Sequence, residues 1–331
     1  MKRRASLLAF LFLGIACGGG GEATVDTTPV DVETSAGAVV LPAEAYLPRT
    51  TFGRLDVDLV RGRQSPYFAN LRELLGGVPL ESDEQRAVLA ELLDRLDGVT
   101  FALGDIRGRG DLTGVILRGS FTLEDVQRWM IGLDQSNRQP EPIDLDGHVG
   151  WTLADASVVP VDERTWILAP TEALRETFAA PSVPAAFSDP TYLEAASRPS
   201  LADTAATLTI LGTERAQQMM TRELPLTAEE AAHVRGIGVA IAAAQGVQVE
   251  GHALTDDPAV AQAIVARAAA ERDELASQAP VMMFGLAPVV RGVEVTAVEA
   301  DAVVRVNLAD DVVRRLFGML GGLMALQGGG Q

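Results

Sequence analysis

Short runs with alternating apolar and polar residues recur along the chain after residue 45, and segments with a helical period separate them. Leu55–Val60 (LDVDLV) alternates with a period of two, which is typical of a half-buried strand. Between residues 84 and 96, apolar residues recur three and four positions apart, which predicts an amphipathic helix. The chain is therefore expected to mix strands and helices throughout.

The first half predicts five strands and four helices. The strands are Leu55–Val60, Gly98–Gly104, Gly114–Phe121, His148–Leu153 and Thr165–Ala169, of which the last two are expected to form a hairpin. The helices are Tyr67–Leu75, Glu84–Leu96, Thr122–Leu133 and Thr171–Phe178. Thr122 and Asp125 have the spacing of a helix-capping pair.

The second half predicts a matching series. The strands are Ala206–Leu211, Gly236–Ala243, Gly246–Leu254, Gly292–Val298 and Ala302–Val306, the last two as a hairpin. The helices are Glu214–Arg222, Thr227–Val234, Asp257–Ala276 and Leu308–Leu326. Each half has the order β-α-β-β-α-β-β-α, which is the split βαβ order of ferredoxin-like folds with one strand more.

The predicted fold is therefore α+β, with two tandem repeats, mostly antiparallel sheets and helices packed on them. The expected domains are a signal peptide (1–16), a lipidated cysteine with a flexible tether (17–44), a first repeat (45–180), a linker (181–203) and a second repeat (204–331) that includes the C-terminal helix. The repeats are expected to lie side by side or to join their sheets edge to edge. Gly236–Ala243 is apolar at nearly every position, which predicts that the other half or a ligand covers both of its faces.

The N-terminus combines three cations with a short apolar run and one cysteine. Lys2, Arg3 and Arg4 precede the run, which is shorter than the ~20 residues that cross a bilayer. Leu13–Cys17 (LGIAC) resembles the lipobox of bacterial lipoproteins, although Gly14 stands where leucine is usual. The alternative is a chance cysteine at the end of an ordinary signal peptide.

This resemblance implies that the signal is cleaved after Ala16 and that Cys17 carries acyl chains, which would hold the protein on a membrane. The residue after Cys17 is glycine, and by resemblance to enterobacterial lipoproteins this favours the outer membrane, facing the periplasm. Gly18–Glu44 has no helical period, and about 27 residues of such a chain span roughly 30 Å. The body resembles uncharacterised exported lipoproteins of GC-rich bacteria in general character, which implies a location and no activity.

Charge and composition exclude several function classes. The formal charge of −18 becomes −21 once the three N-terminal cations leave with the signal, so binding to nucleic acid is not expected. Lys2 is the only lysine, which excludes Schiff-base chemistry and a P-loop lysine in the mature chain. Cys17 is the only cysteine, so no internal disulfide forms. We expect no cofactor and no metal site.

The remaining candidate residues are few. His148 lies near Asp144 and Asp146, which suggests an acid–base pair or a turn before a strand. The glycines of RGRGD (107–111) favour a hairpin turn over a phosphate-binding loop. Glu299 and Asp301 suggest a cation site or a simple turn. Residues 316–326 are apolar on every side, which predicts a closing helix between the halves or a docking helix for a partner or lipid.

The sequence thus favours a membrane-anchored envelope lipoprotein that serves as a non-catalytic binding or assembly module. Its partners would be the membrane, through the N-terminal lipid, and an envelope protein or lipid. A carrier of lipid or another apolar ligand is the first alternative, and it requires a continuous cavity between sheet and helices. An enzyme with dispersed carboxylates is the second, and it requires carboxyl groups with raised pKa values in a cleft.

Overall fold

A computed structural model describes residues 41–70, 72, 83–105, 112–133, 139–224 and 226–328. Two short 3-10 helices are η1 (Ala43–Tyr46) and η2 (Ala185–Ser188). The strands are β1 (Thr51–Asp58), β2 (Leu96–Gly104), β3 (Leu112–Gly119), β4 (Glu141–Leu145), β5 (His148–Leu153), β6 (Ala156–Asp162), β7 (Thr165–Pro170), β8 (Thr204–Leu211), β9 (Val234–Ala242), β10 (Val247–Thr255), β11 (Glu294–Val298) and β12 (Asp301–Leu308).

The α-helices of the first half are α2 (Leu59–Gln64), α4 (Asp83–Arg95), α5 (Leu123–Leu133) and α6 (Thr171–Ala179). Helix α7 (Pro190–Ser197) lies between the halves. Those of the second half are α8 (Glu214–Glu223), α9 (Ala228–His233), α10 (Pro258–Ser277), α11 (Ala279–Met283), α12 (Ala287–Arg291) and α13 (Asp310–Gly328). Of the predicted helix Tyr67–Leu75, residues 68–70 and 72 are helical, and residues 71 and 73–75 lie outside the described ones.

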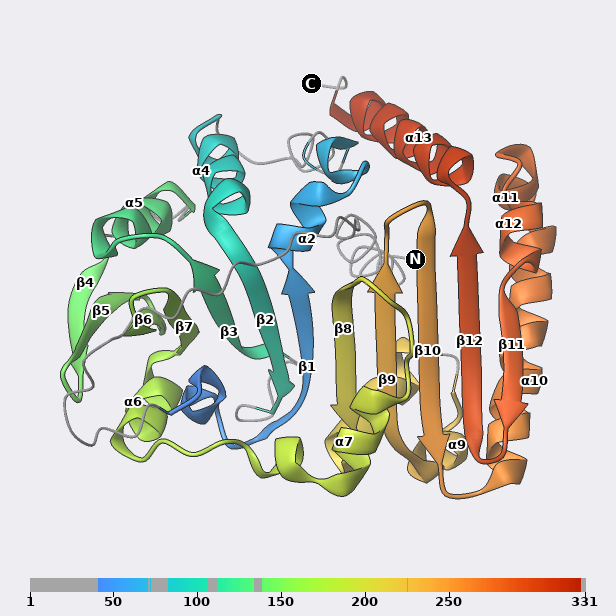
Figure 1. Ribbon diagram of the computed structural model, residues 1–331, viewed down its shortest axis with the longest axis horizontal. Helices are drawn as coiled ribbons and strands as arrows, with labels where there is room; N and C mark the ends of the chain where they lie inside the picture. The colour runs from blue at the N-terminus through green and yellow to red at the C-terminus, as the bar shows by residue number, and fades with distance from the viewer. Residues whose placement is uncertain are drawn as a thin grey trace, which may run out of the picture.

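All the described strands belong to one 12-stranded antiparallel sheet with the order β11-β12-β10-β9-β8-β1-β2-β3-β7-β6-β5-β4 (Figure 1). The protein is thus α+β with mostly antiparallel pairing, as predicted. Of the two expected arrangements, the structure has the edge-to-edge one. The two halves meet where β1 pairs with β8, with Gly53 opposite Ile210 and Val57 opposite Ala206. We call this pairing the seam.

The face of the sheet that carries Leu55 and Val57, here the Leu55 face, holds most of the core. Helices α4, α5 and α13 pack on it in one cluster, and α8, α9 and α10 pack in another. The buried contributors from these helices are Val88, Val126, Trp129, Val313 and Phe317 in the first cluster, and Ala216, Met220, Ala231 and Ile264 in the second. Burial of these side chains supplies the main stabilising free energy of the fold.

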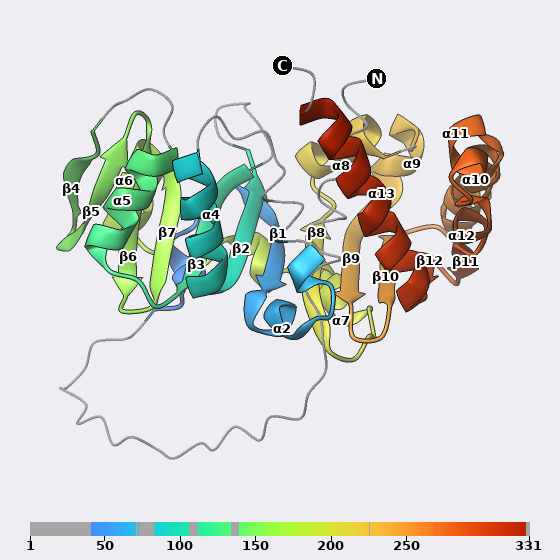
Figure 2. The same ribbon diagram turned by 90° about the horizontal axis from the view of Figure 1, so that it is seen from above.

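The opposite face carries Arg54 and Asp56 and is here called the Arg54 face. In the first half, α6 and η1 cover it through Leu174, Phe178 and nearby apolar residues. In the second half, α7 packs over β8 and β9. Figure 1 shows α7 in front of β8 and β9, and Figure 2 places it on the opposite side of the sheet from α8 and α9.

Both faces of β9 are covered, as its apolar sequence predicts. The element that covers its Arg54 face is α7, from the segment expected to be a linker. A β-carbon on Gly238 would lie 1.9 Å from the carbonyl oxygen of Ala195, so α7 approaches the strand more closely than any side chain would permit. The interval 181–203 therefore also serves as a cover for the sheet.

One predicted pairing in the first half is wrong. His148–Leu153 and Thr165–Ala169 do not form a hairpin with each other, because β6 lies between them and pairs with both β5 and β7. Sequence reasoning missed β6 since Pro160 interrupts its apolar run, and the ladder has a register irregularity between Pro160 and Asp162. It also missed β4, a five-residue strand that contains Pro142.

Candidate functional site

A closed ring of polar contacts joins four elements on the Arg54 face. Arg54 and Asp56 alternate along β1 and therefore point to the same face, where Arg54 Nε lies 2.8 Å from Asp56 Oδ2. Thr100 of β2 donates to Asp56 Oδ1 over 2.6 Å and accepts from Arg118 Nη1 of β3 over 2.8 Å. Glu44 of η1 closes the ring, with its Oε1 3.1 Å from Arg118 Nη2 and 3.7 Å from Arg54 Nη1.

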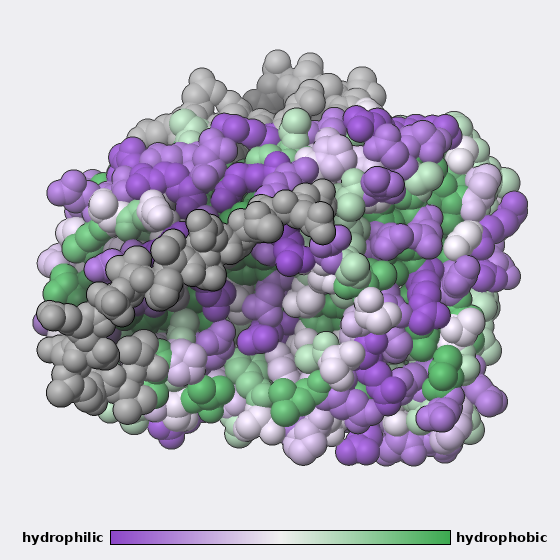
Figure 3. All heavy atoms as spheres, in the orientation of Figure 1, coloured by the Kyte–Doolittle hydropathy of each residue, from purple (hydrophilic) through white to green (hydrophobic). Residues whose placement is uncertain are grey.

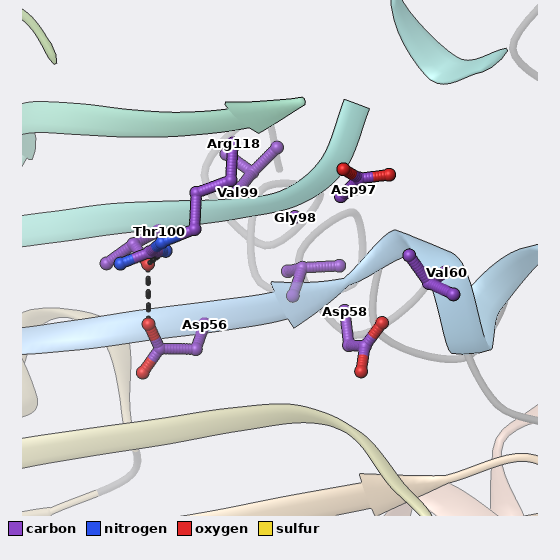
Figure 4. Close-up of a pocket in the computed structure, with 9 residues that line it drawn as sticks. Asp56, Asp58, Val60, Asp97, Gly98, Val99, Thr100 and Arg118 are labelled. Carbon is purple, nitrogen blue, oxygen red and sulfur yellow. Dashed lines mark hydrogen bonds between the residues drawn. The ribbon is translucent and has the colours of Figure 1, made fainter. Parts of the chain in front are cut away.

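The ring borders an open hollow of about 390 Å³ between β1, β2 and the start of α2 (Figure 4). Gly98 of β2 leaves the floor without a side chain, and Asp56 and Asp58 point to the same side of β1. The lining is Asp56, Val57, Asp58, Val60, Asp97, Gly98, Val99, Thr100 and Arg118. Three carboxylates and one guanidinium thus line the hollow.

Each of these carboxylates is already engaged by arginine. Asp58 accepts from the amide of Arg61 over 2.9 Å, as the N-cap of α2, and lies 3.3 Å from the guanidinium of the same residue. Asp97 pairs with Arg63 at 3.4 Å and also with Arg164. Carboxylates held in this way are poor general bases, because their lone pairs are occupied by donors. The arrangement suits recognition by hydrogen bonds better than proton transfer.

Figure 3 views this face in space-filling form. Hydrophilic residues gather along its upper edge and over much of its right side, and hydrophobic residues form smaller groups between them. The Arg54 guanidinium also lies 5.6 Å from the centre of the Phe187 aromatic ring. Helix η2, which contains Phe187, therefore packs against the ring of polar contacts at Arg54.

A second polar cluster lies on the same face in the second half. Glu250 of β10 is 3% exposed, and its carboxylate accepts from the Ser200 amide over 2.8 Å and from Arg305 Nη2 over 2.8 Å. Burial on its own would raise its pKa, but the hydrogen bonds from Ser200, Arg305 and His252 outweigh burial and hold the pKa at about 2. The group is a fixed negative charge under all ordinary conditions.

His252 and Asp301 complete this second cluster. The His252 Nε2 atom lies 3.4 Å from Glu250 Oε1, and its Nδ1 atom lies 3.9 Å from Asp301 Oδ2. Arg198, just after α7, approaches Asp301 to 3.4 Å. Burial raises the pKa of Asp301, and Arg198 and His252 act in the opposite direction.

The candidate residues from the sequence do not form one site in the structure. Ala16, Cys17 and residues 107–111 lie outside the described part of the chain. The Asp144 carboxylate accepts from the amide of Gly147 in the β4–β5 turn, and the His148 Nδ1 atom lies 2.9 Å from the carbonyl oxygen of Pro160. His148 therefore begins a strand, and no contact between it and Asp144 supports an acid–base pair.

Glu299 and Asp301 also lie in different surroundings. Glu299 has a φ of +54° in the turn between β11 and β12, whereas Asp301 is buried in the second cluster. Val313 and Phe317 of α13 pack into the core between the halves, and the side chains of residues 320–328 lie outside the described ones. Within the described ranges, no helix is long and apolar enough to cross a membrane, and no three His, Cys, Asp or Glu side chains are placed to hold a metal ion.

Sequence reasoning missed both polar clusters. Alternation does place Arg54 with Asp56, and Glu250 with His252, on shared faces of their strands. Their partners lie on strands that are distant in sequence, on η1 or in residues 190–203. No local sequence pattern reveals that these segments come together.

Comparison with known proteins gives little further guidance. The chain matches no protein-family model, and no curated protein sequence is significantly similar to it. Among solved structures, crystal form I of TP0453 aligns with a TM-score of 0.47 and 9% identity, over 86% of this chain and 98% of that one. At that level the alignment carries no argument about function.

Proposed function

We propose that this protein is a lipid-anchored lipoprotein of the cell envelope that acts as a non-catalytic binding or assembly module. The observation that carries the proposal is the N-terminal series of three cations, a short apolar run and the stretch Leu13–Cys17. Cleavage after Ala16 and acylation of Cys17 would leave the body tethered to the outer membrane, facing the periplasm.

The Arg54 face is the proposed binding surface. The described chain reaches this face through η1, where Glu44 is held by Arg118 and Arg54, so the tether joins the body on that side. The hollow beside the ring is lined by Asp56, Asp58 and Asp97, each already paired with arginine, so a partner would bind here by exchanging one of these ion pairs for its own. A protein partner in the envelope fits this surface better than an anionic lipid does, because the mature chain carries −21.

We also infer that the body is a tandem repeat. Counted outward from the seam, the strands come in the orders β1-β2-β3-β7-β6 and β8-β9-β10-β12-β11. In sequence, the third strand of each order is followed by a helix, β3 by α5 and β10 by α10. The fourth strand is also followed by a helix, β7 by α6 and β12 by α13. The matching connections support duplication of one unit, with β4 and β5 as an addition to the first.

The two alternatives have weaker support. A carrier requires a continuous apolar cavity, whereas the hollow described above is open and lined by carboxylates. An enzyme with dispersed carboxylates requires raised pKa values in a cleft. Asp301 has a raised pKa, but it lies buried beside Arg198 and not in the hollow.

The decisive experiment is photo-crosslinking of the acylated protein in its own envelope. A photoreactive residue replaces Val60, which lines the hollow and is 43% exposed, and a matched one replaces Val149, which is 47% exposed on the other face. The proposal predicts one reproducible protein adduct from position 60 and none from position 149.

Three results would contradict parts of the proposal. Equal adducts at both positions, or none at position 60, would remove the Arg54 face as the binding surface. A stoichiometric lipid other than the Cys17 acyl groups would favour the carrier. Unchanged membrane association of a Cys17→Ala variant would remove the lipid anchor.

A further inference from the structure

We propose that strand β11 is a self-association edge, at which a second copy of this chain adds its own β11 and extends the sheet across a two-fold axis. Strand β11 is the last strand of the sheet, and four of its five residues are exposed. Among the described residues, no strand pairs with its outer side. This inference goes beyond the proposed function and depends on neither the lipid anchor nor the Arg54 face.

The backbone of β11 presents hydrogen-bonding groups to the outside at two positions. A two-residue turn joins β11 to β12, and Val298 opposite Asp301 closes it. The pair that closes such a turn exchanges hydrogen bonds, and bonded and non-bonded pairs alternate from there along the two strands. Val295 and Ala297 therefore direct their N–H and C=O groups away from β12. Unpaired groups on an edge strand are a template for another strand.

The opposite edge of the sheet is blocked. By the same alternation from the closing pair Leu145–His148, the outward positions of β4 are Pro142 and Asp144. Proline has no N–H to donate, and the Asp144 carboxylate accepts from the Gly147 amide in the turn. Proline and charge are means by which edge strands avoid pairing, and β11 has neither at its outward positions. One open and one blocked edge favour a closed dimer over an open-ended stack of chains.

The first half has a strand bound at the corresponding edge. In the repeat proposed above, β6 is the counterpart of β11, and its outer side pairs with β5, where Trp151 lies opposite Val158 and Leu153 opposite Ala156. Within the described residues, the second half has no counterpart of β5. A strand from a second copy would fill that position. This support rests on the proposed repeat, whereas the contrast between the two edges does not.

The sequence of β11 (EVTAV) is self-complementary in one antiparallel register. With the two-fold axis at Thr296, Val295 lies opposite Ala297 of the second copy, and each such pair exchanges two hydrogen bonds. Glu294, the only charged residue of the strand, then lies opposite Val298, which is 55% exposed. The register therefore places no like charges opposite each other within the two strands.

Charges just beyond the strand also complement each other. The same register brings the turn at Glu299 beside residue 293 of the second copy. The Arg272 guanidinium lies at that position, where its Nη1 donates to the Val293 carbonyl oxygen over 3.0 Å. An acid beside this guanidinium would offset part of the repulsion between two chains that each carry a charge of −18.

Exposed apolar side chains at the same end of the molecule offer further contact area. Helix α10 packs on β11, and α11 and α12 pack on α10, so all three helices lie at this end (Figure 2). Leu275, Met282, Met283 and Phe284 are between 40 and 76% exposed there. A five-residue edge buries less area than a stable dimer needs, so these side chains would have to contribute, and a weak dimer in the micromolar range is expected.

The first test is sedimentation equilibrium of the full chain with Cys17→Ala at micromolar concentrations, where a monomer–dimer equilibrium is expected. Thr296→Lys places like charges opposite each other at the two-fold axis and should weaken the dimer roughly fivefold. Val149→Lys, at an exposed position of β5, is the matched control with the same change in net charge. Since either lysine reduces the negative charge of the chain, the control dimer should be unchanged or slightly tighter. A monomer at all concentrations, or equal effects of the two lysines, would overturn the proposal.

The second test reports the register directly. In the Cys17→Ala background, Thr296→Cys introduces the only thiol of the chain. The two copies of position 296 face each other as a non-hydrogen-bonded pair with Cα atoms about 4.5 Å apart, which is within the range of a disulfide. Mild oxidation should give a disulfide-linked dimer from Thr296→Cys and leave Val149→Cys monomeric. Equal yields at the two positions, or no cross-link at position 296, would show that β11 does not pair with itself.

Discussion

The Tyr67 hydroxyl donates to Asp310 Oδ1 over 2.8 Å, and this bond joins residues 243 positions apart. Tyr67 is fully buried and belongs to the first half, whereas Asp310 opens α13 of the second. The Tyr67 ring also stacks on Phe317 at 6.3 Å, and the Arg314 guanidinium lies over it at 5.9 Å. The start of α13 is thus held against the first half by one aromatic side chain.

Removal of this hydroxyl is expected to weaken the contact between the halves without emptying the core. Tyr67→Phe keeps the stacked ring and loses the hydrogen bond, so the free energy of unfolding should fall by about 1 kcal/mol in urea titration. Asp310 keeps its contact with Arg314 at 2.8 Å and is not left unpaired. A loss above about 3 kcal/mol would show that the ring itself is misplaced in the variant.

The same tyrosine predicts a dependence on alkaline pH. Burial, followed by the bond to Asp310, raises the pKa of Tyr67 to about 12 from an ordinary value near 10. A pKa raised on folding gives stability that is complete below pH 10 and is lost as pH rises toward 12. Unfolding free energy in the parent chain should therefore fall between pH 10 and pH 12, and Tyr67→Phe should show a shallower decline over that range.

Glu250 predicts a large cost when its charge is removed. Glu250→Gln leaves Arg305 and the Ser200 amide around a neutral group, and breaking a buried ion pair in this way costs about 3 kcal/mol. The lowered pKa of Glu250 means that its stabilisation is present above about pH 4.5 and is lost as pH falls toward 2. Acid unfolding followed by circular dichroism should thus be less steep in the variant than in the parent chain.

Weakening the ring of polar contacts on the Arg54 face is expected to loosen η1 locally and to change the free energy of unfolding little. Glu44→Gln weakens the contacts to Arg118 and Arg54, and partly exposed ion pairs contribute less than about 1 kcal/mol. Unfolding free energy should change little, while hydrogen exchange at η1 should increase because the chain there loses its anchor to the sheet. Unchanged exchange at the Leu47 amide would contradict the anchoring role of Glu44.

Strand β9 shows which parts of the fold can be predicted from the sequence. The apolar run at Gly236–Ala243 indicated a strand covered on both faces, because period and composition report burial directly. The identity of the cover was hidden, since α7 is eight residues long and lies in a segment rich in proline. Helix ends were predicted well where capping residues mark them, as at Thr122 and Asp125.

The sequence could not predict the candidate sites, because their residues come from segments that are distant along the chain. Alternation shows that Glu250 and His252 share a face, but Asp301 reaches them only through the register that pairs Leu254 with Asp301. That register depends on the lengths of the intervening helices and turns, which no local pattern encodes. The lipobox resemblance is local in sequence, which is why the N-terminal motif was visible where the polar clusters were not.

Two glycines on neighbouring strands predict opposite outcomes for the same substitution. A β-carbon at Gly238 of β9 would lie 1.9 Å from the carbonyl oxygen of Ala195, so Gly238→Ala must push α7 away from the sheet and should cost about 2 kcal/mol or more. A β-carbon at Gly251 of β10 would lie 3.7 Å from the Val239 side chain, an ordinary contact, so Gly251→Ala should change stability by less than about 1 kcal/mol. Urea titration of the pair separates loss of α7 packing from the general effect of removing a glycine from a strand, and equal costs in the two variants would contradict the close approach of α7 to β9.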